Sequence, residues 1–357
     1  MATIPLEDLL RLVTEEEASD LHLCVGVPPT LRLKGKLVPL SIAPLTAPEM
    51  ETLAQGLARP EQMERVNSEG SVDFGISRDG DRFRVSVYRE RGHLAAAVRM
   101  LPSKLLSLES IGIPPAVREL LDLPRGLVLV TGPTGSGKTT SLASMLTVIN
   151  ETSPRHIITI EDPIEYYLDH KRGIVNQREI GVDVPSFAEG LRRALRQDPD
   201  VILVGEMRDL ETIETAITAA ETGHLVFSTL HTTGASRTID RIVDAFDAQR
   251  QQQIRVQLSM NLKAVISQLL LPKKDGTGRV AVFEVMINTS SIGALLRDNK
   301  SYRIHNEILT GGKYGMVALE GSLVDLFHRG VITRDQVIGF AQDPEVARQL
   351  LGERVAI

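Results

Sequence analysis

A glycine-rich loop at residues 132–139 limits the possible folds of this chain more than any other feature. The loop reads GPTGSGKT and matches the P-loop pattern G-x-x-x-x-G-K-[ST]. Glycine is required at Gly132 and Gly137 because the loop turns its backbone N–H groups inward around phosphates, where Cβ atoms would obstruct the wrap. In such loops the lysine, here Lys138, reaches the β- and γ-phosphates, and the following hydroxyl, here Thr139, ligates Mg²⁺.

The residues around this loop are those that a P-loop requires. Residues 126–130 form a short apolar run typical of a buried strand, and residues 141–146 carry apolar side chains at helical spacing. Strand, loop and helix in this order place a phosphate at a helix N-terminus. We therefore expect the chain to bind a nucleoside triphosphate with Mg²⁺. The residues expected to bind the nucleotide are Gly132, Pro133, Thr134, Gly135, Ser136, Gly137, Lys138, Thr139 and Thr140.

The composition is that of an ordinary globular protein. The 357 residues suffice for about two domains, and 42% are hydrophobic and 24% charged. The formal net charge is −6, with basic residues interspersed among acidic ones, which argues against a nucleic-acid motor and predicts no stable nucleic-acid binding. The N-terminus lacks a secretion signal pattern and no apolar run approaches a membrane span, so we expect a cytoplasmic protein.

The patterns predict an α/β protein with a second, smaller domain. Residues 1–100 indicate a small α+β domain with an antiparallel sheet, and residues 101–120, with three prolines, indicate a linker. Strands alternating with helices over 121–288 predict a parallel sheet, and 289–357 form a helical C-terminal region. In the first domain we expect helices at 6–13 and 48–66, strands at 19–23 and 94–100, a strand at 31–37 that turns at Gly35, and a hairpin of 72–76 with 82–88. In the second we expect strands at 126–130, 157–160, 201–204, 225–230 and 279–286, and helices at 187–196 and 210–221.

Polar residues follow the core strands of the predicted parallel sheet, where ligands bind in open α/β folds. Glu206 follows one strand as a Walker-B-type carboxylate does, and we expect it to orient or polarise the attacking water. Glu161 and Asp162 follow another, and we expect both to act near Mg²⁺, with Asp162 as a metal-site residue. Three interpretations of His231 stay open: it senses the γ-phosphate, it holds Glu206, or it is a structural histidine. His224, just before the same strand, is expected to contribute to nucleotide binding.

Phosphoryl transfer also needs positive charge against the developing negative charge. Alternation places Arg84 on the polar face of the predicted strand 82–88, and Arg99 follows on the next strand. Two interpretations stay open. These arginines form a solvated sheet face, or they act as arginine fingers toward a nucleotide, on a neighbouring subunit. Further candidates are Arg82, Arg91, Arg192, Arg193, Arg196 and Arg208.

Together these motifs resemble those of the secretion ATPases and, among them, the type IV pilus retraction ATPases. The resemblance extends over nearly the whole chain, with the motifs in family order. Besides the P-loop it rests on SDLHL at 19–23, IEDPIE at 160–165, the stretch from DPD to RD at 198–209, and ETGH to HTT at 221–233.

The resemblance implies a RecA-like ATPase domain behind a PAS-like N-terminal domain, assembled as a ring-shaped homohexamer. It implies that 161–165, 205–209 and 224–231 are the Asp box, the atypical Walker B motif and the His box. Glu206 would take the catalytic role, and Arg84 and Arg99 would approach the nucleotide from the N-terminal domain. The implied function is ATP-driven pilus retraction at the cytoplasmic face of the inner membrane, with the pilus platform protein as partner.

Three features bear on the branch of this family. The chain shows no long N-terminal extension, and its single cysteine, Cys24, cannot build a Cys-x-x-Cys zinc site. Both favour the retraction branch over the extension and type II secretion relatives. However, the retraction signature AIRNLIRE is matched by SIGALLRD at 291–298, with Gly293 and Ala294 in place of arginine and asparagine. An accessory retraction paralogue, regulating a second retraction ATPase, therefore stays open as the alternative.

Overall fold

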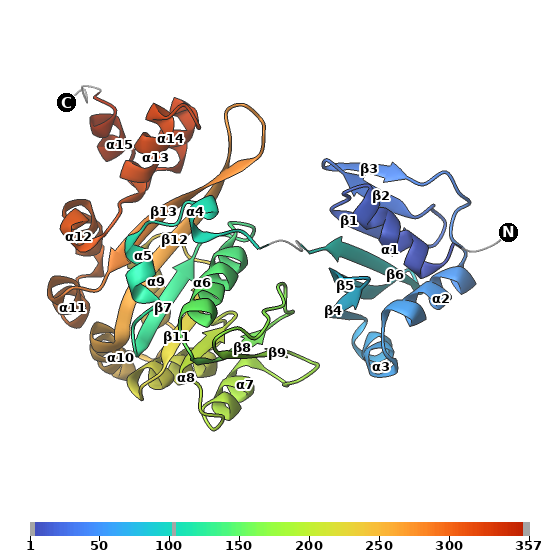
Figure 1. The fold of residues 1–357 in the computed structure, drawn as a ribbon, viewed down its shortest axis with the longest axis horizontal. Coiled ribbons are helices and arrows are strands. Elements are labelled where there is room, and N and C mark those ends of the chain that lie inside the picture. Colours follow the sequence, from blue (N-terminus) through green and yellow to red (C-terminus); the bar gives the residue numbers. More distant parts are fainter. Residues whose placement is uncertain (1–3, 102–104, 353–357) are drawn as a thin grey trace. The chain divides into compact units, whose positions relative to one another are not determined.

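The computed structural model describes residues 4–101 and 105–352, which form two compact units (Figure 1). The first unit is built from residues 4–101 together with the segment 162–167. The second is built from residues 105–161 and 168–352. The predicted linker 101–120 is therefore grouped with the second unit from residue 105 onward, while Pro102 lies outside the described residues.

The first unit is an α+β unit with an antiparallel sheet, as predicted. Within residues 4–101, six strands pair in the order β3-β2-β1-β6-β5-β4. Phe83, Val85 and Val87 alternate into the buried face of the sheet and pack with apolar residues of the three helices. The strands are β1 (Asp20–Cys24), β2 (Thr30–Leu33), β3 (Lys36–Pro39), β4 (Ser71–Arg78), β5 (Asp81–Glu90) and β6 (His93–Met100). The helices are α1 (Leu6–Glu15), α2 (Ala47–Leu57) and α3 (Pro60–Glu69).

Turn chemistry explains where the predictions hold and where they fail. Asp79 and Gly80 have φ values of 52° and 89° and connect β4 to β5 in the predicted hairpin. The single helix predicted over 48–66 is wrong, because Ala58 is extended and Pro60 starts a new helix, α3. The stretch 31–37, predicted as a strand turning at Gly35, is the hairpin β2–β3, which turns at Gly35 with a φ of 83°.

The second unit contains the predicted parallel sheet. Among its described residues, seven strands lie in the order β13-β12-β7-β11-β10-β8-β9, and only the edge strand β13 is antiparallel to its neighbour. The sequence patterns do not predict β9 or β12. The strands are β7 (Gly126–Thr131), β8 (His156–Glu161), β9 (Ile174–Glu179), β10 (Val201–Val204), β11 (Leu225–Leu230), β12 (Leu262–Pro272) and β13 (Arg279–Ile287).

Helices cover both faces of this sheet, because successive side chains of its buried strands point to opposite sides. Leu127 and Leu129 of β7 pack with α7 (Phe187–Ala194), α8 (Leu210–Glu221), α9 (Ala235–Val243), α10 (Ala248–Asn261), α11 (Ser290–Arg297) and α12 (Ile304–Thr310). Val128 and Val130 pack on the other side with α4 (Leu108–Ile111), α5 (Ala116–Leu120) and α6 (Lys138–Thr152).

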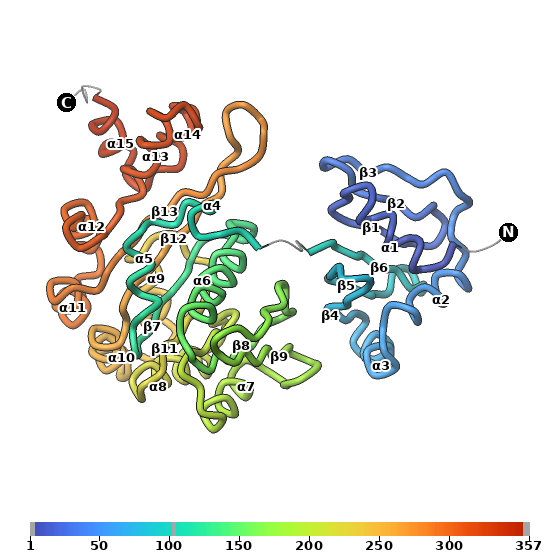
Figure 2. Tube along the Cα trace, in the orientation of Figure 1, coloured from blue at the N-terminus to red at the C-terminus, as the bar shows by residue number. Residues whose placement is uncertain are grey.

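The C-terminal region is helical, as predicted. After α12 the chain forms α13 (Leu319–His328), α14 (Arg334–Phe340) and α15 (Pro344–Leu350). Leu323 and Val337 of these helices pack on Leu269 and Val282, so they cover the ends of β12 and β13 (Figure 2). None of the helices in the described ranges combines the length and apolar character needed to cross a lipid bilayer.

Candidate active site

The P-loop joins the buried strand β7 to helix α6, as predicted. A Cβ atom on Gly132, which has a φ of 142°, would lie 2.1 Å from the main-chain oxygen of Gln268, so no larger residue fits there. Gly137 has a φ of 89° and ends the loop. The Nζ of Lys138 donates to the carbonyl oxygens of Gly132, at 2.7 Å, and Pro133, at 3.1 Å. The lysine ammonium is therefore held inside the loop.

The rest of the loop fits a phosphate ligand. Its tip, residues 133–135, is exposed, while Thr139 and Thr140 at the start of α6 are half-buried. The buried Oγ of Ser136 has no hydrogen-bond partner among the residues that the structure describes. A buried hydroxyl without a partner is costly unless a ligand satisfies it, so this loop has the groups that a phosphate would engage.

His231 connects this loop to Glu206. Its Nε2 lies 3.1 Å from Oε1 of Glu206, and its Nδ1 lies 3.4 Å from Oγ1 of Thr134 in the loop. The contact follows from the topology, because β7, β11 and β10 are adjacent parallel strands and the three residues follow their carboxyl ends. The structure thus brings together three of the predicted site residues. The two that are farthest apart in the sequence, Thr134 and His231, are separated by 97 positions.

Glu161 ends the next strand, β8, and is buried. Its Oε1 accepts hydrogen bonds from Thr159 Oγ1 at 2.6 Å and from Gln177 Nε2 at 3.0 Å. Gln177 belongs to β9, so a strand that the patterns did not predict orients this carboxylate. Asp162 is exposed and belongs to the segment grouped with the first unit, and its role at Mg²⁺ stays a prediction.

His224 does not join this cluster. It precedes β11, whereas His231 follows that strand, so six residues at about 3.3 Å each separate the two histidines. The Nδ1 of His224 lies 3.0 Å from the carbonyl oxygen of Ala219 near the end of α8. Within one chain His224 lies at the opposite end of β11 from the P-loop, and its part in nucleotide binding stays a prediction.

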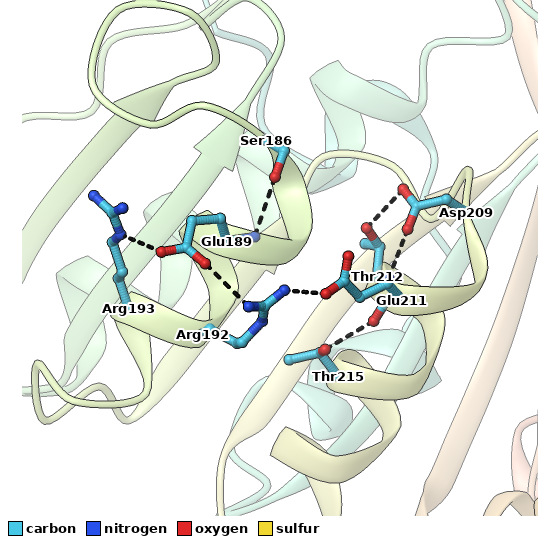
Figure 3. Close-up of polar contacts among 8 residues, drawn as sticks. All are labelled: Ser186, Glu189, Arg192, Arg193, Asp209, Glu211, Thr212 and Thr215. Atoms are coloured by element: carbon cyan, nitrogen blue, oxygen red, sulfur yellow. Dashed lines mark hydrogen bonds and ion pairs between the residues drawn. The ribbon is translucent and has the colours of Figure 1, made fainter.

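The arginines of the second unit divide into two groups. The Nε of Arg208 donates to Oε2 of Glu206 at 2.7 Å, so this arginine is part of the site. Arg192 and Arg193 of α7 are instead engaged by carboxylates at the surface (Figure 3). Both pair with Glu189, and Arg192 also pairs with Glu211 of α8. Arg192 therefore links α7 to α8, whereas Arg193 pairs within α7.

The arginines of the first unit form a row across its sheet. Strand pairing places Arg32, Asp20, Arg99 and Arg84 in register on β2, β1, β6 and β5. Arg99 is 65% exposed and Arg84 is half-buried. Arg82 does not lie on a solvated face: it is buried and its Nε donates to the carbonyl oxygen of Ile164 at 2.6 Å. Arg84 and Arg99 thus remain the candidates for contact with a nucleotide.

Sequence reasoning missed Gln268, a buried residue of β12. Its Oε1 accepts a hydrogen bond from Ser141 Oγ on α6 at 2.8 Å, and its main-chain oxygen faces Gly132. One residue therefore supports both ends of the P-loop. A polar residue inside the apolar run 264–271 was the available signal, but it has meaning only once β12 is known to lie beside β7.

Known proteins resemble this chain over most of its length. The family model described as "Type II/IV secretion system protein" matches residues 6–313. The "Type IV pilus retractation ATPase PilT" of Pseudomonas aeruginosa is 46% identical over 341 residues, which are 95% of this chain and 99% of that protein. The "Type IV pilus ATPase PilU" of the same organism is 38% identical, over 97% of this chain and 91% of that protein.

A solved structure confirms the predicted fold class. The crystal structure of "the Pilus Retraction Motor PilT and Bound ADP" matches with a TM-score of 0.90 and 44% identity, over 98% of this chain and 100% of that chain. At this identity and coverage the α/β architecture with a RecA-like ATPase domain is shared. The chain therefore belongs to the type II/IV secretion system protein family, as its motifs predicted.

Proposed function

We propose that this chain is an ATP-hydrolysing motor that works as a homohexamer and powers the retraction of type IV pili. The observation that carries the proposal is the bridge formed by His231 between Glu206 and Thr134 of the P-loop. It joins a candidate base to the phosphate-binding loop, which is the arrangement that phosphoryl transfer to water needs. The relatives named for pilus retraction support the same function.

Each residue of the site would have a defined task. The backbone N–H groups of residues 132–137 and Lys138 would hold the phosphates. Glu206 would orient the attacking water and accept its proton, while His231 and Arg208 hold its two carboxylate oxygens. Mg²⁺ would be held by Thr139 and Asp162, with Glu161 nearby, and would supply neutralisation of charge on the β- and γ-phosphates.

Positive charge at the γ-phosphate would come from Arg84 and Arg99 of a neighbouring subunit. In register on adjacent strands, both lie on one face of the first unit's sheet. A site completed between subunits requires assembly for activity, which is why the proposal includes the ring. The motor would act in the cytoplasm against the inner-membrane platform protein, with no nucleic acid bound.

The accessory alternative has one specific observation in its favour. Gly293 is buried in α11, and a Cβ atom there would lie 3.3 Å from the main-chain oxygen of Ser259. The arginine of the retraction signature would require α10 and α11 to give by a few tenths of an ångström here, so the packing of these two helices would differ from that in a chain with the full signature. The intact bridge at His231 favours the motor, as does the higher identity to PilT than to PilU.

Steady-state ATPase activity against protein concentration tests the proposal. Specific activity should rise as the ring assembles and vanish in Glu206→Gln, which should still bind ATP. Glu211→Gln, the same change at an exposed carboxylate of α8, is the matched control and should keep wild-type turnover. Negligible wild-type turnover by the assembled protein would reject the motor and support the accessory module.

Retraction itself is tested in the native host. Deletion of the gene should abolish twitching and increase the number of surface pili, and complementation should succeed with Glu211→Gln but not with Glu206→Gln. Normal retraction after deletion would contradict the proposed cellular role, whatever the ATPase result.

A further inference from the structure

The start of helix α9 is held by two neighbouring strands. Its capping residue, Gly234, has no side chain that could accept a hydrogen bond from the first N–H groups of the helix. Side chains of other strands accept these hydrogen bonds instead. The N–H of Gly234 donates to Ser267 Oγ on β12 at 2.9 Å, and the N–H of Ala235 donates to Glu284 Oε1 on β13 at 2.8 Å. Ser267 and Glu284 are directly paired across the two strands, so a single pair of neighbouring residues in the sheet fixes the position of this helix.

The second oxygen of Glu284 reaches the C-terminal helices. Its Oε2 accepts a hydrogen bond from Gln342 Nε2 at 2.8 Å. The main-chain N–H groups of Gln342 and Asp343 donate in turn to Oε1 of Glu320 on α13, at 2.9 Å and 3.0 Å. A continuous set of hydrogen bonds therefore connects the start of α9 to the loop between α14 and α15 and to α13.

Close packing reinforces this connection. Gly234 has a φ of 87°, and a Cβ atom there would lie 2.7 Å from Gln342 Nε2. Glu284 is 1% exposed, and its burial raises the pKa of its carboxyl group, although the bond from Ala235 and the charge of His305 oppose that rise. Burial of a carboxylate is unfavourable unless its oxygens are hydrogen-bonded. Both oxygens of Glu284 are bonded, so breaking either bond would displace the group.

Helix α9 begins four residues after His231. Because His231 contacts both Glu206 and the P-loop, a shift at the start of α9 moves the histidine away from them. Misplacement of a reacting group by about 1 Å costs up to about a hundredfold in rate. The position of α9 therefore controls whether the bridge can form.

We propose that Glu284 is a positioning residue of the hydrolysis site, which holds the start of α9, and thereby His231, in register with the C-terminal helices through Gln342. This inference rests on the proposed function, because its target is the contact of His231 with Glu206. The C-terminal helices would then influence hydrolysis through the hydrogen bond between the amide of Gln342 and the buried carboxylate of Glu284.

A swap of the two side chains tests it. The single variants that break the bond are both made at position 342: in Gln342→Glu two carboxylates face each other, and in Gln342→Ala the donor is removed. Glu284→Gln by itself does not break the bond, because the amide of Gln342 can rotate and accept from the new N–H₂ group. In the double variant Glu284→Gln/Gln342→Glu, the amide at 284 can still accept from Ala235 and can donate to the carboxylate at 342. Charge, size and the bond between the two positions are all restored in the double variant alone.

The readouts are kcat, KM for ATP and melting temperature of the full-length assembled protein. Gln342→Glu and Gln342→Ala should each lower kcat about tenfold while KM stays within about threefold, and the swap should restore kcat to within about threefold of wild type. Gln342→Ala, which removes only the donor at an exposed position, decides the outcome if Gln342→Glu fails to fold. Unchanged kcat in the folded variants at position 342, or a swap that stays as slow as Gln342→Glu, would overturn the inference.

Hydrogen exchange of the peptide over 231–243 separates this inference from the proposed function. Both single variants at position 342 should speed exchange at the start of α9, and the swap should return it to the wild-type rate. If the wild type does not hydrolyse ATP, the proposed function fails. The exchange pattern still decides whether Glu284 positions the start of α9. Exchange that does not change in any variant would reject the positioning role.

Discussion

Arg99 of β6 donates from its Nε to Oδ1 of Asp20 on the neighbouring strand β1, at 2.8 Å. Asp20 is 10% exposed in its side chain, and its Oδ2 accepts a hydrogen bond from Ser19 Oγ at 2.8 Å. Arg99 uses its Nε for this pair, and its side chain is 65% exposed. The guanidinium is thus oriented by a nearly buried carboxylate at the surface of the sheet, where an arginine finger must be both fixed and accessible.

The first prediction concerns the acid stability that this pair confers. Burial alone would raise the pKa of Asp20, but the hydrogen bonds from Arg99 and Ser19 outweigh it and hold the pKa below its ordinary range. The folded state then binds this proton more weakly than the unfolded chain, so Asp20 stabilises the fold above the ordinary aspartate pKa of about 3.9. That contribution is lost as the pH falls through the lower pKa of the folded state.

Asp20→Asn should therefore lower the melting temperature at pH 7, and the difference from wild type should shrink as the pH falls below about 4. Thermal unfolding followed by circular dichroism between about pH 3 and 7 measures this. Asp325→Asn removes an exposed carboxylate of α13 and should give little difference at any pH. A deficit of Asp20→Asn that stays constant down to pH 3 would show that the carboxylate charge is not its cause.

The second prediction concerns the proposed arginine fingers. Arg99→Ala and Arg84→Ala should each reduce kcat strongly, because arginine fingers contribute about a thousandfold or more in other P-loop systems. Arg65→Ala, at an exposed position of α3, is the control and should hydrolyse ATP at the wild-type rate. ATPase assays on the assembled protein measure this, and normal turnover in both finger variants would mean that the positive charge comes from elsewhere.

The third prediction concerns the backbone of the P-loop. Gly132→Ala should abolish ATP binding and lower the melting temperature, because its Cβ would lie 2.1 Å from the main-chain oxygen of Gln268. Gly135→Ala is the matched change: its φ is 77° and nothing lies within 4 Å of the added atom. It should lose only about 1 kcal/mol of stability for the left-handed backbone. Binding of a fluorescent ATP analogue with thermal unfolding distinguishes the two, and equal behaviour would contradict the close approach of β12.

The fourth prediction concerns the bridge at His231. His231→Ala should lower kcat by up to about a hundredfold, because misplacing a reacting group by about 1 Å has about this cost, while KM for ATP changes little. His231→Gln, whose amide can still donate to Glu206, should recover part of the loss. Initial rates over a range of ATP concentrations separate kcat from KM. A raised KM with unchanged kcat would instead mean that His231 only binds the substrate.

The predicted elements were those with strong local signals. The hairpin at Asp79-Gly80 was predicted because a two-residue turn needs residues that tolerate positive φ. The central strands were predicted from apolar runs followed by polar residues. β12 was missed because a short apolar run after a helix reads equally as helix or strand. The break at Pro60 was missed because the helical periodicity continues across it.

The sequence by itself determined that the chain has a P-loop between a buried strand and a helix, and that carboxylates and a histidine follow the neighbouring strands. Only the tertiary structure decided which of these side chains meet. It separates His224 from His231 by the length of β11, and it pairs His231 with Glu206. It also brings Gln268 to the P-loop and Glu284 to the start of α9. The physical reason is that local patterns depend on neighbours within a few residues, whereas these contacts join strands and helices that are distant in sequence and meet only when the sheet is assembled.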